Sequence, residues 1–562
     1  MRKTCLRAFE HCYYYIFNLD SVLRAISLRG HRALPLALMM IVALLILALT
    51  CGHLAGADVG TKPTNLPNVL FIISDDLRAE IDAPGFSCGT GCWTPNLFSL
   101  ASMPGATSFK RAYVQQALCA PSRNSFLTGR RPDSTKSWNF IDSFRERGVG
   151  ENWTSLPQYF KEKGYTVVGT GKVFHKGLPP NWDMPRSWDD RMGTEWKGWL
   201  YPSESRCPNG TVWCAVEESG DVTEFEDTQI TQRALELHAN VSKMDSPWFL
   251  AVGYRKPHVQ WKVPSRFLDA IPIKDVTTPR HGIFPHGADE IAFHQPVDDF
   301  LKPFSDVVEC GGVEANTPFS KFSRECQLHF RRAYHASVAF MDSQIGILIH
   351  HLKVAGDMNN TVVVVLGDHG WHLGEGAMWE KFTNFELAAR TPLIIRAPLQ
   401  IAKRDHALVS NQLVELIDVY PTLTDLIFDD VRPSLEGKSL CSIIVSGSRR
   451  VPLKNVSLSQ FPRCVTDKKN PWKNNDCSDV PRSDFTHMGY SIRTASFRYT
   501  KWFGWNGDKL KPDINSVHGI ELYDHRKDDG RYVDMRFEHE NVAKQYPKIV
   551  ETMDALLMQN MS

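Results

Sequence analysis

The chain has 562 residues, 43% of them hydrophobic, which is enough for one large domain with a buried core and a smaller domain. Lysine and arginine number 64 against 63 aspartate and glutamate residues, so the formal net charge at pH 7 is +1. This balance gives no reason to expect nucleic acid as a partner, and any site for an anion must be local.

An uncharged apolar segment near the N-terminus, residues 33–51, follows three arginines. About 20 helical residues cross a membrane, so this segment fits both a signal peptide and a membrane anchor. Small residues follow it, as signal peptidase prefers. We therefore predict that residues 1–57 target the chain to the endoplasmic reticulum and are cleaved near Ala57, with a retained anchor as the alternative.

Both alternatives place the rest of the chain in an oxidising lumen, and six N-x-S/T sequons agree with N-glycosylation there. The sequons begin at Asn152, Asn209, Asn240, Asn359, Asn455 and Asn560. Four local cysteine pairs could form disulfides: Cys88/Cys92, Cys207/Cys214, Cys310/Cys326 and Cys464/Cys477. Cys119 and Cys441 then remain unpaired, which requires an explanation in a secreted protein.

Buried strands are predicted from short apolar runs rich in branched residues. The run at residues 68–73 ends abruptly in Ser74, Asp75 and Asp76, and residues 361–370 repeat this design with Asp368 and His369 at the end. Similar runs occur at 166–169, 248–252 and 392–395, separated by stretches long enough for crossover helices. The pattern predicts a mainly parallel sheet.

One helix is predicted just before residue 361 from an apolar stripe with spacings of three and four residues. Its members are Phe330, Tyr334, Val338, Met341, Ile345, Leu348 and Leu352. Ligands bind at the carboxyl ends of strands in open parallel sheets. We therefore expect Asp75, Asp76, Asp368 and His369 to converge on one rim.

The predicted fold class is α/β, with a large, mainly parallel or mixed sheet flanked by helices and a smaller C-terminal α+β subdomain. We expect a main domain over residues 66–433 and the subdomain over 434–562, where segments are shorter and turns more frequent. Residues 488–502 alternate like an antiparallel strand, and residues 179–213 are typical of a long surface insertion.

The most specific motif is CAPSRNSFLTGRR, from Cys119 to Arg131. We predict a short polar turn and then a brief helix stopped by Gly129, with backbone amides and Arg123 facing one anion. A lone cysteine is usually a small buried hydrophobe or half of a disulfide. The pattern C-x-P-S-R followed by L-T-G-R, however, resembles the signature of the type I sulfatases, members of the alkaline phosphatase-like superfamily.

The resemblance implies that a formylglycine-generating enzyme oxidises Cys119 to formylglycine in the endoplasmic reticulum. A hydrated aldehyde carries two hydroxyls on one carbon, so one can attack sulfur while the other later expels sulfate. Among the catalytic residues that the resemblance implies, Lys172 and His175 of GKVFH hold the sulfate and the formylglycine, and His258 of KPH protonates the leaving alkoxide. Lys381 is a second sulfate-binding lysine. Each of these side chains could instead be an ordinary surface residue.

Three carboxylates brought together raise one another's pKa unless a cation neutralises them, and oxygen ligands favour Ca²⁺ or Mg²⁺ over zinc. The Asp-Asp pair alone could be a solvated strand end. The resemblance implies a Ca²⁺ ion there. Its implied ligands are Asp75, Asp76, Cys119, Asp368 and His369. The last position is commonly asparagine in the family, and imidazole is a softer partner for calcium.

The Asp-His form resembles one branch of the family, and the likeness to that branch extends over most of residues 68–524. It implies that the protein removes 2-O-sulfate from heparan and dermatan sulfate. The implied location is the lysosome or the extracellular space. Residues 217–325 and those after Val431 fit less well, which leaves the exact sugar open. A phosphodiesterase or phosphonate hydrolase of the same superfamily is another alternative, but such an enzyme would usually carry threonine or serine, or additional metal-binding histidines, in place of CAPSR. Another carbohydrate or aryl sulfatase, or a glycan-binding pseudoenzyme with unconverted Cys119, remains an alternative.

Overall fold

The computed structural model describes residues 66–89, 91–189, 206–221, 224–294, 304–315, 317–447 and 453–561. The predicted targeting segment lies outside these ranges, as does much of the predicted insertion between residues 179 and 213. Residues 67–562 form one compact unit, which is the unit described below. Within the described ranges, no helix combines the length and the apolar character needed to span a bilayer.

The centre of this unit is an eight-stranded sheet in the order β11-β2-β10-β7-β1-β5-β3, with β12 also paired to β2. Its strands are β1 (Asn68–Asp75), β2 (Ala106–Tyr113), β3 (Thr166–Gly171), β5 (Trp248–Pro257), β7 (Thr361–Gly367), β10 (Arg390–Arg396), β11 (Leu408–Ser410) and β12 (Val414–Glu415). Strands β3, β5, β1 and β7 run parallel, whereas β10 is antiparallel to both of its neighbours. The predicted mixed α/β sheet is thus confirmed.

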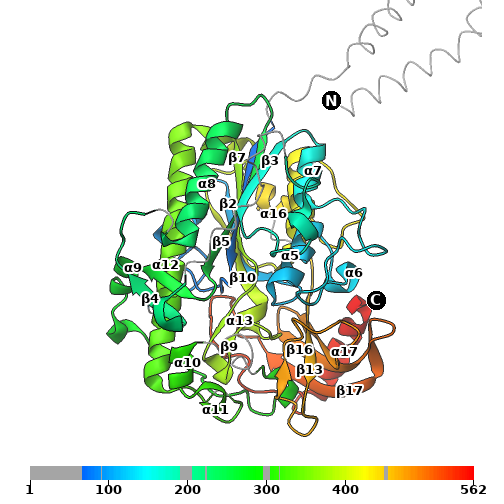
Figure 1. Cartoon of the computed structure of the whole chain (residues 1–562). Helices are drawn as coiled ribbons and strands as arrows, with labels where there is room; N and C mark the ends of the chain where they lie inside the picture. The colour runs from blue at the N-terminus through cyan, green and yellow to red at the C-terminus, as the bar shows by residue number, and fades with distance from the viewer. Residues whose placement is uncertain are drawn as a thin grey trace, which may run out of the picture. The chain divides into compact units, whose positions relative to one another are not determined.

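Helices cover both faces of the sheet, with α8 and α12 on one side and α5 and α7 on the other (Figure 1). The longer helices are α4 (Pro95–Ala101), α5 (Cys119–Thr128), α7 (Leu156–Glu162), α8 (Glu226–Val241), α12 (Arg324–Ala355) and α15 (Val419–Phe428). The shorter ones are α6 (Pro132–Thr135), α9 (Ser265–Asp269), α10 (Ser305–Glu309), α11 (Gly312–Ala315), α13 (Glu386–Ala389), α14 (Leu399–Ala402) and α16 (Cys441–Ser446).

Helix α12 is the helix predicted from the apolar stripe. It begins a little earlier than the stripe, because Ser323 caps its start by accepting a backbone hydrogen bond, and it ends at Gly356 in the left-handed conformation. Tyr334 on its buried face donates a hydrogen bond of 2.8 Å to the carbonyl of Asp76. The helix therefore supports the end of β1 from behind.

Strands β1 and β7, at the centre of the sheet, consist almost wholly of buried apolar residues, as expected for a parallel sheet covered on both faces. Their register pairs Asn68 with Thr361 and Ser74 with Gly367. The acidic residues that follow each strand consequently emerge side by side at the carboxyl edge.

A close approach between β3 and β5 depends on two glycines. Gly171 has a φ of +71°, and a Cβ atom there would lie 2.1 Å from the carbonyl oxygen of Gly253. A Cβ atom on Gly253 would in turn lie 2.1 Å from the Lys172 backbone. Only glycine fits at either position, and the backbone N–H of Lys172 donates to the Gly253 carbonyl at 2.7 Å. This contact directs Lys172 toward the rim of the sheet.

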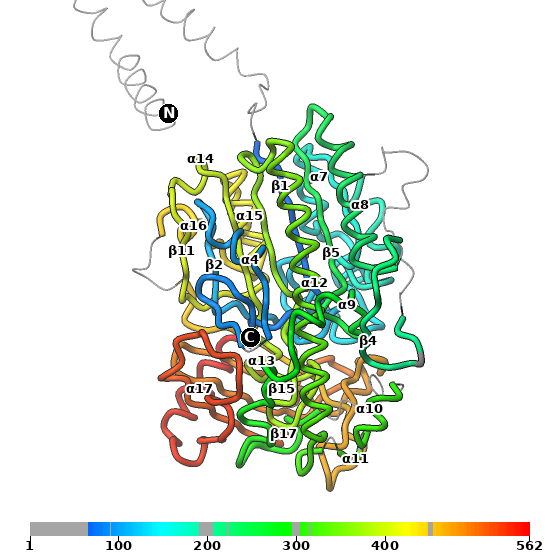
Figure 2. The backbone as a smooth tube through the Cα atoms, turned by 90° about the vertical axis from the view of Figure 1, so that its left-hand side faces the viewer, coloured from blue at the N-terminus to red at the C-terminus, as the bar shows by residue number. Residues whose placement is uncertain are grey.

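The C-terminal part contains a five-stranded sheet in the order β14-β13-β15-β16-β17 and a final helix. These elements are β13 (Ser457–Val465), β14 (Asn474–Asn475), β15 (His487–Arg493), β16 (Phe497–Asn506), β17 (Lys511–Asp524) and α17 (Pro547–Met561). They lie at the end of the main sheet where β1 and β7 terminate (Figures 1 and 2). The predicted boundary between residues 433 and 434 stays a prediction.

The single strand expected over residues 488–502 is wrong, because the segment is a hairpin of β15 and β16. Thr494 turns the chain: its side-chain oxygen accepts a hydrogen bond of 3.0 Å from the backbone N–H of Phe497. Two very short sheets complete the fold. They are β4 (Trp213–Val216) with β6 (Trp261–Pro264), and β8 (His372–Leu373) with β9 (Trp379–Glu380).

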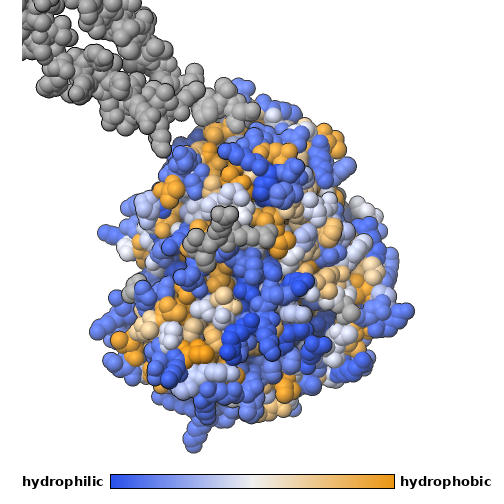
Figure 3. All heavy atoms as spheres, turned by 180° about the vertical axis from the view of Figure 1, so that it is seen from behind, coloured by the Kyte–Doolittle hydropathy of each residue, from blue (hydrophilic) through white to orange (hydrophobic). Residues whose placement is uncertain are grey.

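The four predicted disulfides are all present, joining Cys88 to Cys92, Cys207 to Cys214, Cys310 to Cys326 and Cys464 to Cys477. Of the described cysteines, Cys119 and Cys441 remain as thiols, as expected. Hydrophilic and hydrophobic residues are mixed over the face drawn in Figure 3. Sequon asparagines are exposed at Asn152, Asn240, Asn359, Asn455 and Asn560.

Candidate active site

Side chains from the ends of four parallel strands surround the start of α5. Asp75 ends β1, Lys172 follows β3, His258 follows β5, and Asp368 and His369 follow β7. These residues are far apart in the sequence. The structure brings them to one edge of the sheet, as the strand pattern predicts.

Cys119 is the first residue of α5 and is 1% exposed. Its Sγ lies 3.4 Å from Asp75 Oδ1, 3.4 Å from His369 Nε2 and 3.3 Å from Lys381 Nζ. The predicted polar turn ahead of the helix is wrong, since the helix already begins at Cys119. Pro121 is accommodated because residues in the first turn have no helical acceptor for their N–H groups. Gly129 ends the helix with a φ of +66°, as expected.

Arg123 connects four segments of the chain and is fully buried. Its Nε donates to Asp368 Oδ2 at 2.9 Å and its Nη2 to Asp75 Oδ1 at 3.3 Å. Nη1 donates to the carbonyls of Lys172 and Val173. Burial alone would lower the pKa of Arg123, but Asp368 and Asp75 outweigh it and raise that pKa. The guanidinium is therefore a fixed positive charge at the N-terminus of α5.

Two lysines pair with the adjacent aspartates. Lys172 Nζ lies 2.5 Å from Asp75 Oδ2, and Lys381 Nζ lies 2.9 Å from Asp76 Oδ1. Burial raises the pKa of Asp75, but the charge of Lys172, followed by those of His258 and Arg123, holds that pKa well below its usual value. Asp75 is accordingly ionised. The predicted cations thus gather around the candidate nucleophile.

Asp76 has the strongest signature of a metal ligand. Burial and the charges of Asp75 and Asp368 raise its pKa, although Lys381 and His369 oppose this. Its Oδ2 is buried without a hydrogen-bond partner in the described part of the chain. One ligand atom from each of four residues falls within 4.8 Å of the others: Asp75, Asp76, Cys119 and His369. The two carboxylates suit a hard divalent cation, whereas the Cys119 thiol and the His369 imidazole are softer donors, so the fit to Ca²⁺ requires that residue 119 present oxygen in place of sulfur.

The pair after β7 lies in the same cluster. Asp368 is engaged at both oxygens, since Oδ1 accepts a 2.9 Å hydrogen bond from the backbone N–H of Asp76 and Oδ2 binds Arg123. His369 Nε2 is 3.4 Å from Asp76 Oδ1. Burial lowers the pKa of His369, but Asp368 and Cys119 raise it to about 9. The raised pKa favours a proton on Nε2 of His369. A cation bound at Nε2 would have to replace this proton, so metal binding would depend on pH.

Two further predicted histidines flank the cluster. His258 is buried, its Nδ1 donates to the Val259 carbonyl at 2.6 Å, and burial followed by the charge of Arg255 lowers its pKa well below the usual value. His175 is half-buried and stacks on Phe140 with ring centroids 4.4 Å apart. Burial, followed by the charge of Lys172, also lowers the pKa of His175 well below the usual value.

Sequence reasoning missed two residues that position this edge. Arg255 Nη1 lies 4.0 Å from Asp75 Oδ2, and its place three residues before His258 at a strand end could have indicated it. Asp227, at the start of α8, accepts backbone hydrogen bonds of 2.7 Å from Arg255 and 3.1 Å from Lys256. Burial raises the pKa of Asp227 to about 7, partly opposed by Lys256. No local sequence signal marks Asp227.

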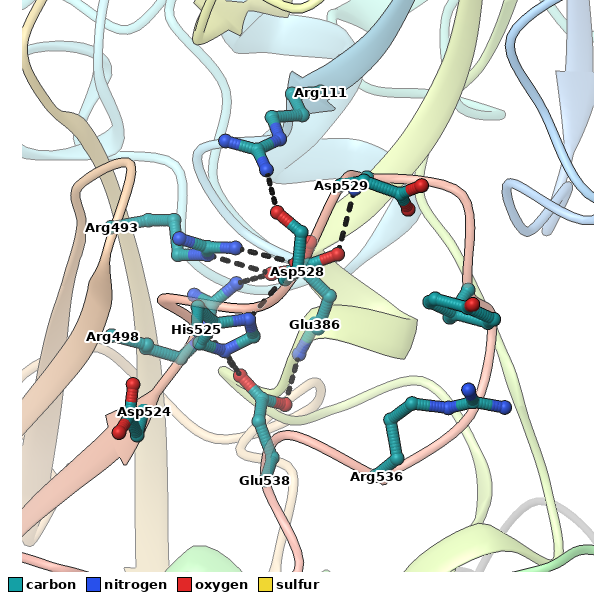
Figure 4. Close-up of polar contacts among 12 residues, drawn as sticks. Arg111, Glu386, Arg493, Arg498, Asp524, His525, Asp528, Asp529, Arg536 and Glu538 are labelled. Atoms are coloured by element: carbon teal, nitrogen blue, oxygen red, sulfur yellow. Dashed lines mark hydrogen bonds and ion pairs between the residues drawn. The ribbon is translucent and has the colours of Figure 1, made fainter.

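A second acid and histidine cluster joins α13 to the C-terminal part (Figure 4). Glu386 Oε2 accepts hydrogen bonds of 3.1 Å from Arg493 and 2.5 Å from Arg498. Glu538 Oε1 accepts hydrogen bonds of 2.6 Å from Arg498 and 3.1 Å from His525, and its Oε2 accepts from the Glu386 backbone. Because these carboxylates already have partners, the cluster is an ion-pair network and not a metal site.

Replacing Glu386 with glutamine is expected to lower the free energy of unfolding by up to about 3 kcal/mol, because Arg493 and Arg498 each lose one of two carboxylate partners. Burial raises the pKa of Glu386, but Arg493 and Arg498 hold it well below its usual value. The stabilisation is therefore present above about pH 4 and is lost as pH falls through the folded-state pKa. Urea unfolding at several pH values checks this: wild-type stability should fall with acid more steeply than that of Glu386→Gln.

The mixed sheet flanked by helices, with charged residues at its carboxyl edge, is the fold of the alkaline phosphatase-like class. The structure superposes on the phosphonate monoester hydrolase of Silicibacter pomeroyi with a TM-score of 0.64 at 20% identity, covering 88% of this chain and 95% of that one. It superposes on a 2-O GAG sulfatase with a TM-score of 0.61 at 20% identity, covering 88% and 92%. These likenesses show the fold.

The sequence comparisons define the family within that class. The sulfatase family model matches residues 67–429. The chain is 32% identical to iduronate 2-sulfatase of Homo sapiens over 537 residues, covering 85% of this chain and 92% of that protein. It is 27% identical to choline-sulfatase of Rhizobium meliloti over 451 residues, covering 75% and 80%. The chain belongs to the sulfatase family and is a sulfuric ester hydrolase.

Proposed function

We propose that this sulfatase removes the 2-O-sulfate of iduronate in heparan sulfate and dermatan sulfate, using a formylglycine made from Cys119 and a Ca²⁺ ion. The observation that carries the reaction is the position of the Cys119 sulfur, 3.3–3.4 Å from an aspartate, a histidine and a lysine at the N-terminus of a helix. The substrate is proposed from the 32% identity to iduronate 2-sulfatase, which spans 92% of that enzyme.

The cationic side chains account for sulfate binding. Arg123, Lys172, Lys381 and Arg255 bring four positive charges to a cluster that holds three aspartates, before any metal is counted. This excess favours an anionic ester and stabilises negative charge on its oxygens as the bond to sulfur breaks. Helix α5 adds the positive end of its dipole.

A Ca²⁺ ion held by Asp75, Asp76, His369 and the converted residue 119, with Asp368 alongside, would supply Lewis-acid polarisation of the sulfate. The unpartnered Oδ2 of Asp76 supports this assignment. Asp368 would accept a proton from the attacking hydroxyl. The Nδ1–H of His258 is committed to the Val259 carbonyl, so the proton for the leaving alkoxide would come from Nε2–H of the imidazolium form. A bound sulfate ester places negative charge beside this ring and thereby favours its protonated form.

His258→Gln is expected to reduce sulfate release from a sulfated disaccharide by about 10²–10⁴-fold, the usual contribution of a general acid. Hydrolysis of 4-nitrophenyl sulfate should fall far less, because that leaving group departs without a proton. His350→Gln, at an exposed position on α12, serves as the matched control. Equal losses on both substrates would exclude His258 as the proton donor.

Substrate assays also separate the alternatives. Purified protein is expected to release sulfate from disaccharides that end in 2-O-sulfated iduronate, and not from those sulfated only on glucosamine or galactosamine. Preference for another sulfated sugar or an aryl ester would keep the sulfatase and reject this substrate. An unconverted Cys119, together with no turnover of any ester, would indicate a glycan-binding pseudoenzyme.

The proposed setting is the secretory pathway, with the lysosome or the extracellular space as the destination. Four disulfides and five exposed sequon asparagines support folding and N-glycosylation in an oxidising lumen. The proposed partners are a formylglycine-generating enzyme during maturation and the sulfated glycosaminoglycan during catalysis.

A further inference from the structure

Glu380 is an anomaly beside the proposed sulfate site. Its side chain is 0% exposed, and both carboxyl oxygens are buried without a hydrogen-bond partner among the described residues. Buried polar groups are rarely left unpaired, because each one loses its hydration without compensation. The other buried carboxylates named above are paired or, in the case of Asp76, paired at one oxygen. Glu380 is therefore maintained at a cost to stability.

The backbone around Glu380 is strained in the same place. Glu380 has a φ of +72°, and Phe382, two residues later, has a φ of +66°. Neither is glycine, so both residues occupy a conformation that side chains disfavour. Between them stands Lys381, which contacts Asp76 and Cys119. The strained segment thus holds the proposed sulfate-binding lysine and the unpartnered carboxyl together.

Two other unpartnered polar atoms belong to residues that contact Phe382 or the neighbouring Phe293. His294 Nδ1 is buried without a partner in the described chain, and its ring centroid is 4.7 Å from that of Phe382. Asn474 Oδ1 is likewise unpartnered, while its Nδ2 donates to the carbonyl of Phe293 at 3.0 Å. We call Glu380, His294 and Asn474 the Glu380 cluster. Within the part of the chain that the structure describes, its unpartnered atoms are the two carboxyl oxygens of Glu380, Nδ1 of His294 and Oδ1 of Asn474.

We propose that the Glu380 cluster binds a hydroxyl group of the substrate next to the sulfate ester, with Glu380 as the specificity-determining residue. This inference rests on the proposed sulfatase function and adds to it the chemical group recognised beside the sulfate. Three observations support it: the Glu380 carboxyl lies within electrostatic reach of Lys381 and Asp76, both of its oxygens lack a partner among the described residues, and Lys381 Nζ is 3.3 Å from the candidate nucleophile.

The charges around Glu380 favour a neutral hydroxyl over an ion. Burial raises the pKa of Glu380 well above its usual value, and Asp476 and Asp76 raise it further while Lys381 lowers it. A protonated carboxyl both donates and accepts, which matches a hydroxyl. The negative charge of Asp476 would repel a substrate carboxylate, and the positive charge of Lys381 would repel a substrate ammonium. A sugar sulfate with a free neighbouring hydroxyl satisfies both restrictions.

The test is a cycle of two enzymes and two substrates. Wild type and Glu380→Met are assayed on an iduronate 2-sulfate disaccharide and on its analogue lacking the hydroxyl beside the sulfated carbon. We expect wild type to prefer the hydroxylated substrate by about 10- to 100-fold in kcat/KM, the usual effect of one buried hydrogen bond. Glu380→Met should bring this preference close to one. Glu380→Gln should retain part of it, because an amide also donates and accepts.

Controls distinguish recognition from folding. Glu380→Met removes an unpartnered buried carboxyl, so its midpoint of thermal unfolding should equal or exceed that of wild type. Glu521→Gln is the matched control, because Glu521 is buried but accepts hydrogen bonds from Trp502 at 3.2 Å and Tyr523 at 2.9 Å. It should keep the wild-type preference. An unchanged preference in Glu380→Met, or equal losses on both substrates, overturns the inference alone. Wild type inactive on every sulfate ester overturns the proposed function with it.

Discussion

Replacing Cys119 with alanine is expected to lower sulfate release by at least about 10⁴-fold, the scale seen when a nucleophile is removed from an enzyme. The fold should persist, because alanine fits the volume of a buried thiol and α5 keeps all its other contacts. Cys119→Ala should therefore show a far-ultraviolet circular dichroism spectrum and an unfolding midpoint close to those of wild type. Activity is measured as free sulfate from a 2-O-sulfated disaccharide.

Cys441→Ala provides the matched control, since Cys441 is the other described free thiol. It lies half-buried in α16 and is not among the residues that contact Cys119. It should retain wild-type turnover. Mass spectrometry of the wild-type peptide containing Cys119 should show the thiol replaced by an aldehyde. Turnover retained by Cys119→Ala would exclude residue 119 as the nucleophile and, with it, the proposed reaction.

Asp76→Asn is expected to abolish both turnover and the response to calcium. Wild type freed of metal by chelation should gain about 2.7 kcal/mol of unfolding free energy when Ca²⁺ is added at a hundred times its dissociation constant. Asp76→Asn should gain almost nothing, because the unpartnered Oδ2 becomes an amide. Without calcium, the variant should be at least as stable as wild type, since it relieves the crowding of three carboxylates.

Asp405→Asn controls for the loss of one negative charge, because its side chain is 98% exposed. It should retain the full thermal response to calcium. The comparison does not depend on activity, so it tests metal binding separately from conversion of Cys119. A wild-type unfolding curve that calcium leaves unchanged would remove the ion from the mechanism.

The position of the candidate site could be predicted because it depends on local patterns. A run of branched apolar residues predicts each buried strand. The change from apolar residues to an acid, between Ile73 and Asp75 or at Asp368 after Gly367, marks the end of the strand. Parallel pairing then places these ends together. The CAPSR motif adds Cys119 by resemblance, although the sequence did not indicate that the helix begins at that residue.

Other features depend on contacts between distant segments and carry no local signal. Asp227 is one acid in the first turn of an ordinary helix, yet it holds the backbone of Arg255 and Lys256. Glu386 and Glu538 lie 152 residues apart and meet only after the C-terminal sheet has packed. The hairpin within residues 488–502 has no strong turn signal in the sequence, because a threonine, and not glycine or proline, makes its turn.

Helix α5 has a consequence for the order of events during biogenesis. All ten of its residues are buried, and the Cys119 sulfur is enclosed by three side chains. In the folded protein the Cys119 thiol is 1% exposed, so a modifying enzyme would not reach it there. If Cys119 is converted as proposed, the conversion would precede folding, and chains that fold before it would remain inactive.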